Sequence, residues 1–417
     1  MLKAILIDCI PPSISNREAQ YRLDEAENLI KTYGGIVIVK KISRLRPTPD
    51  YRTYIGKGKL EEIVNESKTL NANILIINNE LKPNQIYNIN EELRKSSENE
   101  RKLASLVPGK IKKDFRPPLQ AWDRVDIILK IFQKHAMTRE ARLEIQLASI
   151  KHMGPRIFGM GMELSRQGGG IGTRGVGETN TEFMKRHLSK MEYRILQELE
   201  NCKKVRQLHR SSRRRKDYKT VGIIGYTNTG KTSLLNALTR KGAYTADKLF
   251  ATLDTRIGKM YVDIPVTEES VLKPGTTRLS PEEILVSDTI GFIENLPTTL
   301  IQSFQSTLEE TVEADLLLHV IDLGDSRWLE KIKIVNEVLF KIDALYKPTI
   351  YVFNKVDIHH GENLEKLATK FRLFRPCFVS ATQREGMESL KTTISQSLFP
   401  QIFQSKITEV LETFRQL

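Results

Sequence analysis

The first hundred residues alternate between short apolar runs and longer amphipathic runs. The short runs, at 3–8, 35–42 and 73–78, are rich in Ile and Val and have the length of buried strands. The segments between them repeat apolar residues at three- and four-residue spacing, which predicts helices. The order βαβαβ predicts a small parallel sheet with crossover helices. We assign residues 1–120 to this N-terminal βα domain, including a polar, basic linker at its end.

From residue 126 the spacing of apolar positions becomes that of long helices. A first helix is expected to end at a Gly-Pro pair at 154–155, and a second begins near residue 181. Two long amphipathic helices around a connection predict an antiparallel hairpin, which we place at 121–216. The connection is longer than most loops and contains the stretch GGGIGTRGVGET at 168–179.

Beyond residue 217 the pattern returns to apolar strands separated by helical segments, from TVGIIGY at 220–226 to PCFVS at 376–380. This alternation predicts a doubly wound α/β domain at 217–400, which a short C-terminal helix at 401–417 follows. The predicted fold class is therefore α/β: a small parallel βα domain, a long antiparallel helical hairpin, and a doubly wound domain.

The segment GYTNTGKT joins a predicted strand to a predicted helix and matches the phosphate-binding pattern G-x-x-x-x-G-K-[ST]. Its glycines let backbone amides curl around phosphates, while Lys231 supplies a cation and Thr232 a hydroxyl for Mg²⁺. Nucleotide binding is therefore predicted for Gly225, Tyr226, Thr227, Asn228, Thr229, Gly230, Lys231, Thr232 and Ser233.

The segment SDTIG closes another predicted strand and supplies further phosphate contacts. Asp288 is placed to reach Mg²⁺ through a water molecule, and the Gly291 amide to bind the γ-phosphate. GTPases commonly place Gln after this motif to orient the attacking water, whereas this chain has Phe292. We therefore expect slow intrinsic hydrolysis that a partner accelerates.

Two motifs near the end of the α/β domain select the base. In NKVD, the Asp357 carboxylate can accept hydrogen bonds from the guanine N1 and N2 hydrogens, which adenine lacks. Asn354 and Lys355 are expected to frame the ring. In SAT, the Ala381 amide is expected to reach the guanine carbonyl, flanked by the other two residues of the motif, Ser380 and Thr382. With the phosphate motifs in the same order along the chain, these residues predict a P-loop GTPase domain.

The segment LFATLDTR at 249–256 is the predicted first switch. Thr252 is expected to complete the Mg²⁺ shell, with Thr255 as the alternative. Arg256 is either a charge-stabilising group or a solvated switch residue. The predicted catalytic residues are thus Lys231, Thr252 and Gly291, and the predicted metal ligands are Thr232, Thr252 and Asp288.

The net charge of +14 favours a nucleic acid or an anionic membrane surface as partner, although a generally basic surface without a partner is the alternative. No run approaches 18 apolar residues, and Asp8 interrupts the N-terminal run where a signal peptide would stay apolar. We expect a cytoplasmic monomer without an integral membrane segment, which leaves peripheral membrane association open. The cysteines lie far apart and fit buried positions better than a metal site or a disulfide: Cys9, Cys202 and Cys377.

The whole chain resembles the HflX family of ribosome-associated GTPases. The resemblance rests on YIGKGKLEEI at 54–63, the helical segment 127–148, SRQGGGIGTRGVGET at 165–179, and the motifs GYTNTGKT and LFATLD. It implies GTP and GDP as ligands, binding to the large ribosomal subunit and ribosomal RNA, and dissociation or rescue of stalled ribosomes. The alternatives are a GTPase of ribosome assembly or RNA maturation, and a GTP-sensing RNA-binding scaffold.

With this resemblance, the glycine-rich stretch becomes the tip of the hairpin. Bare backbone there can approach structured RNA closely, and the predicted RNA contacts are Gly169, Gly170, Arg174 and Gly175. A flexible hinge is the alternative.

Three features of the sequence keep further alternatives open. Asn228 in the P-loop either holds K⁺ beside the phosphates or only shapes the loop. GKGK at 56–59 is a second phosphate loop or, as we favour, the turn that starts a helix. The chain departs from the family pattern ATLDPTTR with a shorter ATLDTR, which leaves the switch threonine open between Thr252 and Thr255.

Overall fold

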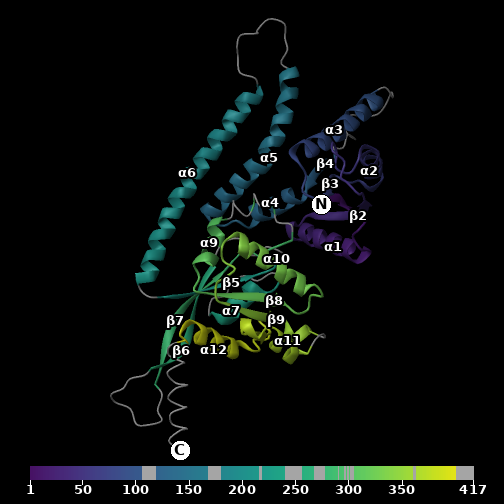
Figure 1. The fold of residues 1–417 in the computed structure, drawn as a ribbon. Helices are drawn as coiled ribbons and strands as arrows, with labels where there is room; N and C mark the ends of the chain where they lie inside the picture. The colour runs from purple at the N-terminus through teal and green to yellow at the C-terminus, as the bar shows by residue number, and fades with distance from the viewer. Residues whose placement is uncertain are drawn as a thin grey trace, which may run out of the picture. The chain divides into compact units, whose positions relative to one another are not determined.

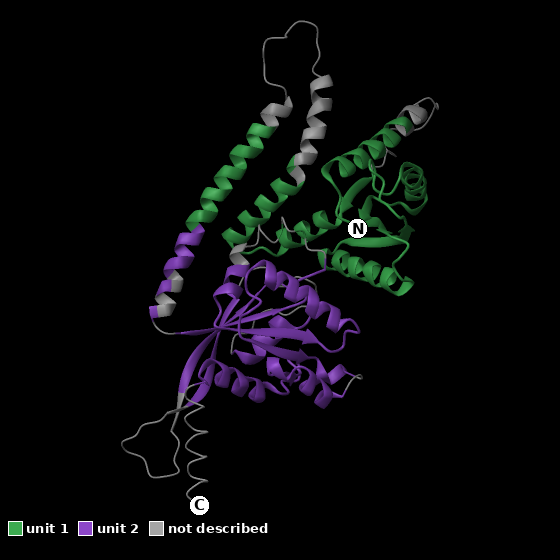
Figure 2. Ribbon diagram, in the orientation of Figure 1, with its two compact units in different colours: residues 1–201, 297–303 green, residues 202–296, 304–417 purple. Residues whose placement is uncertain are grey.

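The protein folds as the α/β chain that the sequence predicts, with an N-terminal parallel sheet, a helical region and a P-loop GTPase domain (Figure 1). A computed structural model describes residues 1–105, 119–167, 180–215, 218–239, 256–266, 278–289, 291–294, 297, 300, 305–359 and 363–400. The chain divides into two compact units, 1–201 with 297–303 and 202–296 with 304–417 (Figure 2). The division falls inside helix α6, whereas the sequence placed the hairpin in a segment of its own.

The sheet of unit 1 is parallel, in the order β2-β1-β3-β4. Its strands are β1 Leu2–Ile10, β2 Ile36–Leu45, β3 Ile74–Ile77 and β4 Gln120–Asp123. The helices that connect them are α1 Asn16–Tyr33, α2 Lys57–Leu70, α3 Pro83–Ser105 and α4 Arg124–His135. The three predicted strands are confirmed, and GKGK begins α2 with Gly56 as its N-cap, as we favoured.

The prediction of a polar linker after the third strand is wrong for its first part. Helix α3 continues to Ser105, and the short strand β4 was not foreseen. Ion pairs one turn apart, Arg94 with Glu98 and Lys95 with Glu91, support the polar part of this helix. The polar part of α3 and the strand β4 were not predicted, because the prediction relied on apolar periodicity alone.

The helical hairpin consists of α5, Arg139–Gln167, and α6, Asn180–Arg215. Arg139 Nη2 lies 2.8 Å from Glu198 Oε2, and a Cβ at Gly154 would lie 3.5 Å from Leu188 Cδ1. The two contacts advance in opposite directions along the helices, so the predicted antiparallel pairing is confirmed. The prediction of a single helix from residue 126 to 154–155 is wrong in two ways. The chain leaves the helix after His135 and α5 begins at Arg139, and the apolar pattern and α5 continue beyond the proline. The tip residues 168–179, with all four predicted RNA contacts, lie outside the described residues.

Unit 2 contains a six-stranded sheet in the order β10-β9-β8-β5-β7-β6, with only β6 and β7 antiparallel among the paired strands. The strands are β5 Lys219–Gly225, β6 Arg256–Val266, β7 Arg278–Asp288, β8 Leu316–Asp322, β9 Thr349–Asn354 and β10 Cys377–Val379. The helices are α7 Lys231–Leu238, α9 Gln305–Glu313, α10 Trp328–Lys341, α11 Leu364–Lys370 and α12 Met387–Leu398, with 3₁₀ turns η2 Val356–Ile358 and η3 Arg372–Phe374. The predicted C-terminal helix at 401–417 lies outside the described residues.

Both faces of this sheet are covered. On β9, Ile350 and Val352 pack with α7 and α12, while Tyr351 and Phe353 pack with α10 and α11. Alternate residues of a strand point to opposite faces, so the two clusters are separate layers of core. The strand order reverses at β5, and in such sheets ligands bind at the carboxyl ends of the strands beside the reversal. The predicted motifs lie at those ends.

Candidate active site

The P-loop motif leaves the carboxyl end of β5 and ends at the second residue of α7. Gly225 has a φ of 151° and Gly230 a φ of 88°, both in the region that favours glycine. A Cβ at Gly225 would collide with the Val320 carbonyl oxygen, and one at Gly230 with Asn354 Nδ2. Both glycines are therefore required by close packing. Gly230 caps α7 without a side chain, so the amides of the first turn are not masked by a capping side chain and can bind an anion.

Lys231 is buried at the centre of this loop. Its Nζ donates a hydrogen bond of 2.6 Å to the Tyr226 carbonyl oxygen. Burial lowers the pKa of Lys231 to about 8, and the nearby Asp288 carboxylate opposes that shift. A buried cation lacks the stabilisation that water would give it. The negative charge of a bound phosphate group would therefore stabilise the charged form of Lys231 strongly.

Two of the three predicted metal ligands meet in the structure. Thr232 Oγ1 donates a hydrogen bond of 2.7 Å to Asp288 Oδ2, which joins the start of α7 to the end of β7. A hydroxyl and a carboxylate are the oxygen ligands that Mg²⁺ takes in P-loop proteins, so these residues fit the ion and would place it against the phosphates. The third predicted ligand, Thr252, and its alternative Thr255 lie outside the described residues, while Arg256 begins β6.

Gly291 lies against the P-loop lysine. A Cβ at Gly291 would lie 2.8 Å from Lys231 Nζ and 2.9 Å from Thr227 Cα, closer than real Cβ contacts allow. The next residue fixes this approach, because Thr227 N donates to Phe292 O at 2.7 Å and Phe292 N donates to Gly225 O at 3.1 Å. The Phe292 ring is 1% exposed, so its side chain belongs to the core and has no polar group to offer a water molecule.

Asn354 connects three of the predicted motifs. Its Nδ2 donates to Thr229 O in the P-loop at 2.8 Å, and its Oδ1 accepts from Ala381 N at 3.0 Å. The sequence predicted that Asn354 frames the guanine ring and that the Ala381 amide hydrogen-bonds to the guanine carbonyl. In the structure the Asn354 side chain and the Ala381 amide form hydrogen bonds that connect the loops of the site to one another. No local sequence pattern indicates this role, because the partners are far apart in sequence.

The remaining predicted base-binding residues follow the ends of β9 and β10. Lys355 has a φ of 66°, and its Nζ pairs with Asp322 Oδ2 at 2.7 Å. Asp357 lies in the turn η2 with its side chain exposed, where a base can reach it. Ser380 Oγ and Thr382 Oγ1 are hydrogen-bonded at 3.2 Å and close the SAT turn.

Three P-loop residues complete the predicted set. Thr229 Oγ1 donates to the Tyr226 carbonyl oxygen at 3.1 Å. Asn228 is exposed with a φ of 63°, and Ser233 is half-buried in the first turn of α7. The described predicted residues of the P-loop and the three strand-end motifs thus all lie in unit 2, around the carboxyl ends of its strands.

Comparison with known proteins assigns the chain to a family. Family models match it in sequence order: GTP-binding GTPase N-terminal at 20–97, GTP-binding GTPase Middle Region at 135–213 and 50S ribosome-binding GTPase at 220–355. The GTPase HflX of Caldanaerobacter subterraneus subsp. tengcongensis is 38% identical over 93% of this chain and 79% of its own length. This chain belongs to the HflX family of GTPases. The resemblance stated from the motifs is confirmed.

A further curated relative agrees with this assignment. The GTPase HflX of Escherichia coli is 36% identical over 81% of this chain and 69% of its own length. Among solved structures, a GTP-binding protein from Sulfolobus solfataricus in complex with GDP is 25% identical, with 95% of this chain and 98% of that one covered and a TM-score of 0.46. As a member of the HflX family of GTPases with the P-loop site described above, the chain hydrolyses GTP, as the sequence predicted.

We expect Asp357→Asn to weaken GTP binding by about 100-fold or more, because two charge-assisted hydrogen bonds to the guanine edge are lost. Binding of xanthosine triphosphate should improve, since the amide reverses the hydrogen-bond polarity. Titration calorimetry with both nucleotides measures the exchange. Glu365→Gln, the same change on an exposed residue of α11, is the matched control. An Asp357→Asn protein that binds GTP as tightly as the wild type would show that the residue does not select the base.

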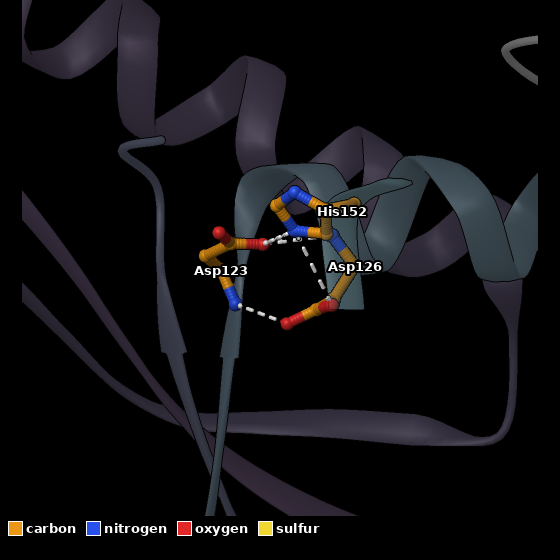
Figure 3. A group of neighbouring side chains, drawn as sticks. All are labelled: Asp123, Asp126 and His152. Atoms are coloured by element: carbon orange, nitrogen blue, oxygen red, sulfur yellow. Dashed lines mark hydrogen bonds and ion pairs between the residues drawn. The ribbon is translucent and has the colours of Figure 1, made fainter. Parts of the chain in front are cut away.

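A second group of ligand-type side chains lies in unit 1 of this HflX-family chain (Figure 3). His152 Nε2 lies 3.2 Å from Asp123 Oδ1 and 3.6 Å from Asp126 Oδ1. The two carboxylates also form a capping box at the start of α4, and Asp123 Oδ2 accepts from Leu81 N at 3.3 Å. Asp123 and Asp126 therefore cap helix α4, and their contact with His152 connects this cap to helix α5.

No described helix is both long enough and apolar enough to cross a membrane.

Proposed function

We propose that this chain is a cytoplasmic, monomeric GTPase that binds the large ribosomal subunit and dissociates or rescues stalled ribosomes. The observation that carries the proposal is the match of 220–355 to a family described as 50S ribosome-binding GTPases, on a chain whose N-terminal and middle regions also match GTPase-specific families. Relatives named GTPase HflX match most of this chain.

The surface of the hairpin supports an RNA partner. Helix α6 exposes seven cationic side chains among its described residues, and arrays of this kind bind phosphate backbones through release of counterions: Lys185, Arg186, Lys190, Arg194, Lys203, Lys204 and Arg215. Helix α5 ends at Gln167 and α6 begins at Asn180, so the glycine-rich residues connect two helices as the tip of the hairpin. We assign the RNA contacts to this tip, at Gly169, Gly170, Arg174 and Gly175.

Cosedimentation with purified ribosomal subunits tests the proposal. With a non-hydrolysable GTP analogue present, the protein should pellet with mature large subunits and not with small ones. A large-subunit precursor that binds better than the mature subunit would favour a role in assembly. Lys190→Glu on α6 should weaken binding, whereas Lys366→Glu, an exposed lysine of α11, is the control for charge reversal alone.

We also propose that K⁺ bound near Asn228 stimulates hydrolysis. The Asn228 side chain is exposed at a backbone angle that asparagine tolerates and that glycine can also adopt. An ion there would stabilise phosphate charge as an arginine finger does. We expect turnover about tenfold faster in K⁺ than in Na⁺ at equal ionic strength, and Asn228→Gly should remove the difference while keeping the loop. Equal rates in the two salts for the wild type would exclude the ion.

A further inference from the structure

The threonine hydroxyls around the P-loop differ in their partners. Thr229 Oγ1 donates to Tyr226 O at 3.1 Å, Thr232 Oγ1 to Asp288 Oδ2 at 2.7 Å, and Thr289 Oγ1 to Ile223 O at 2.8 Å. Thr227 Oγ1 is buried and has no hydrogen-bond partner among the described residues. The whole residue is 4% exposed, so bulk water does not supply one. A buried hydroxyl without a partner destabilises a fold, and such groups persist mainly where function needs them.

The position of Thr227 connects this hydroxyl to the reaction. The point where a Cβ of Gly291 would lie is 2.9 Å from Thr227 Cα, 3.0 Å from Thr227 Cγ2 and 2.8 Å from Lys231 Nζ. Three groups therefore meet at one place: the P-loop lysine, the glycine whose amide is expected to bind the γ-phosphate, and the methyl group of Thr227, which shares its Cβ atom with the hydroxyl. We expect the γ-phosphate and the water that attacks it to lie beside this junction, because Lys231 and the Gly291 amide are the predicted phosphate contacts.

The chain has an unfilled role at that place. The residue after Gly291 normally orients the attacking water, but here it is Phe292, whose ring is buried and apolar. We propose that the Thr227 hydroxyl is the catalytic group that takes over this role, by hydrogen bonding to the attacking water and the γ-phosphate. A hydroxyl suits the task because it can accept a hydrogen bond from water and donate one to a phosphate oxygen.

The step consumes no group of the protein. The water oxygen forms a bond to the γ-phosphorus, and the bond from that phosphorus to the β–γ bridging oxygen breaks. The electron pair of the broken bond stays on GDP, and the proton lost by the water ends on inorganic phosphate. Thr227 holds the water in line for attack and is unchanged at the end, so its contribution is one of positioning within the transition state.

Thr227→Val separates this role from a structural one, because valine keeps the branched shape and removes only the hydroxyl. We expect intrinsic kcat to fall about 100-fold, at the lower end of the range for a group that assists proton transfer in the transition state. KM and the affinity for GDP should stay within about twofold. The melting temperature should rise by about 2–4 °C, because the unpartnered hydroxyl is gone.

Two further variants keep the test decisive. Thr227→Ser retains the hydroxyl and should restore most of the lost kcat. Thr311→Val is the matched control, because Thr311 Oγ1 is also buried without a partner among the described residues but lies on α9. It should raise the melting temperature and leave kcat unchanged.

The inference fails if Thr227→Val hydrolyses GTP at the wild-type rate. It also fails if valine and serine lower kcat equally, since shape and not the hydroxyl would then matter. If the valine variant does not fold, Thr227→Ala takes its place with the same expected loss of kcat. All measurements use intrinsic turnover without ribosomes, so their outcome does not depend on the proposed ribosomal partner.

Discussion

Lys231→Met should lower the kcat for GTP hydrolysis by about 10²–10³-fold, as expected when one group that stabilises transition-state charge is removed. The side chain is buried beside Gly291, so no solvent cation can replace it. Single-turnover hydrolysis at saturating GTP measures the loss. Burial holds the pKa of Lys231 below its unfolded value, so the charged lysine destabilises the nucleotide-free fold at pH 7. The methionine variant should therefore melt at a higher temperature while it loses activity.

The same lysine predicts a pH dependence of binding. In the nucleotide-free protein Lys231 loses its proton near pH 8, and the negative charge of a bound phosphate raises the pKa of Lys231. GTP affinity should therefore be level below pH 8 and fall above it, by up to about tenfold per pH unit. Calorimetry between pH 7 and pH 9 measures the slope, and Lys231→Met should lack it. A wild-type affinity that stays level to pH 9 would show that the lysine is charged throughout.

Replacing residues 168–177 by a short Ser/Gly linker should abolish most of the stimulation of GTP turnover by large ribosomal subunits. Intrinsic turnover and GTP affinity should be preserved, because the described predicted nucleotide-binding residues all lie in unit 2. Steady-state turnover with and without subunits measures both effects. Arg174→Ala should give a milder loss and lower the salt dependence of binding by about one unit, as expected when one phosphate contact is removed.

The hinge interpretation of the tip predicts a different outcome. A flexible linker would then serve as well as the native glycine-rich sequence, because only mobility would matter. Full stimulation in the linker variant would therefore reject RNA contact by the tip. A loss of intrinsic turnover in that variant would instead show that the replacement disturbs the G domain.

The phosphate half of the site could be predicted from the sequence because its requirements are local. Gly225, Gly230, Lys231 and Thr232 act through a strand–loop–helix turn that eight consecutive residues encode, and the structure brings them together as expected. Asp288 and Gly291 follow from the same logic at the end of the neighbouring strand. Their relation to Lys231 depends on β7 lying parallel beside β5, an order that the alternation of strands and helices alone does not give.

The contacts that hold the site together could not be predicted in this way. Asn354 bonds across 125 residues to Thr229 and across 27 to Ala381, and no spacing rule covers such distances. That Thr227 Oγ1 has no partner among the described residues is likewise visible only in the folded structure. In unit 1 the clamp of His152 on Asp123 joins α5 to α4, although the pattern of two aspartates three residues apart does signal the helix cap itself.

Two of the errors in element boundaries have one physical cause. The sequence predicted that α5 ends at the Gly-Pro pair and that the polar end of α3 is a linker, because each segment lacks a local helix signal. Tertiary and side-chain contacts override such signals: Gly154 lies against Leu188, and ion pairs line α3.

Turnover of GTP with and without purified large ribosomal subunits tests the account most directly. Alone, the protein should hydrolyse GTP slowly, because the buried Phe292 stands where GTPases commonly place the glutamine that orients the attacking water. Added large subunits should raise kcat by about tenfold or more, with saturation at high subunit concentration, while small subunits should have no effect. A turnover rate that large subunits leave unchanged would contradict the proposed function.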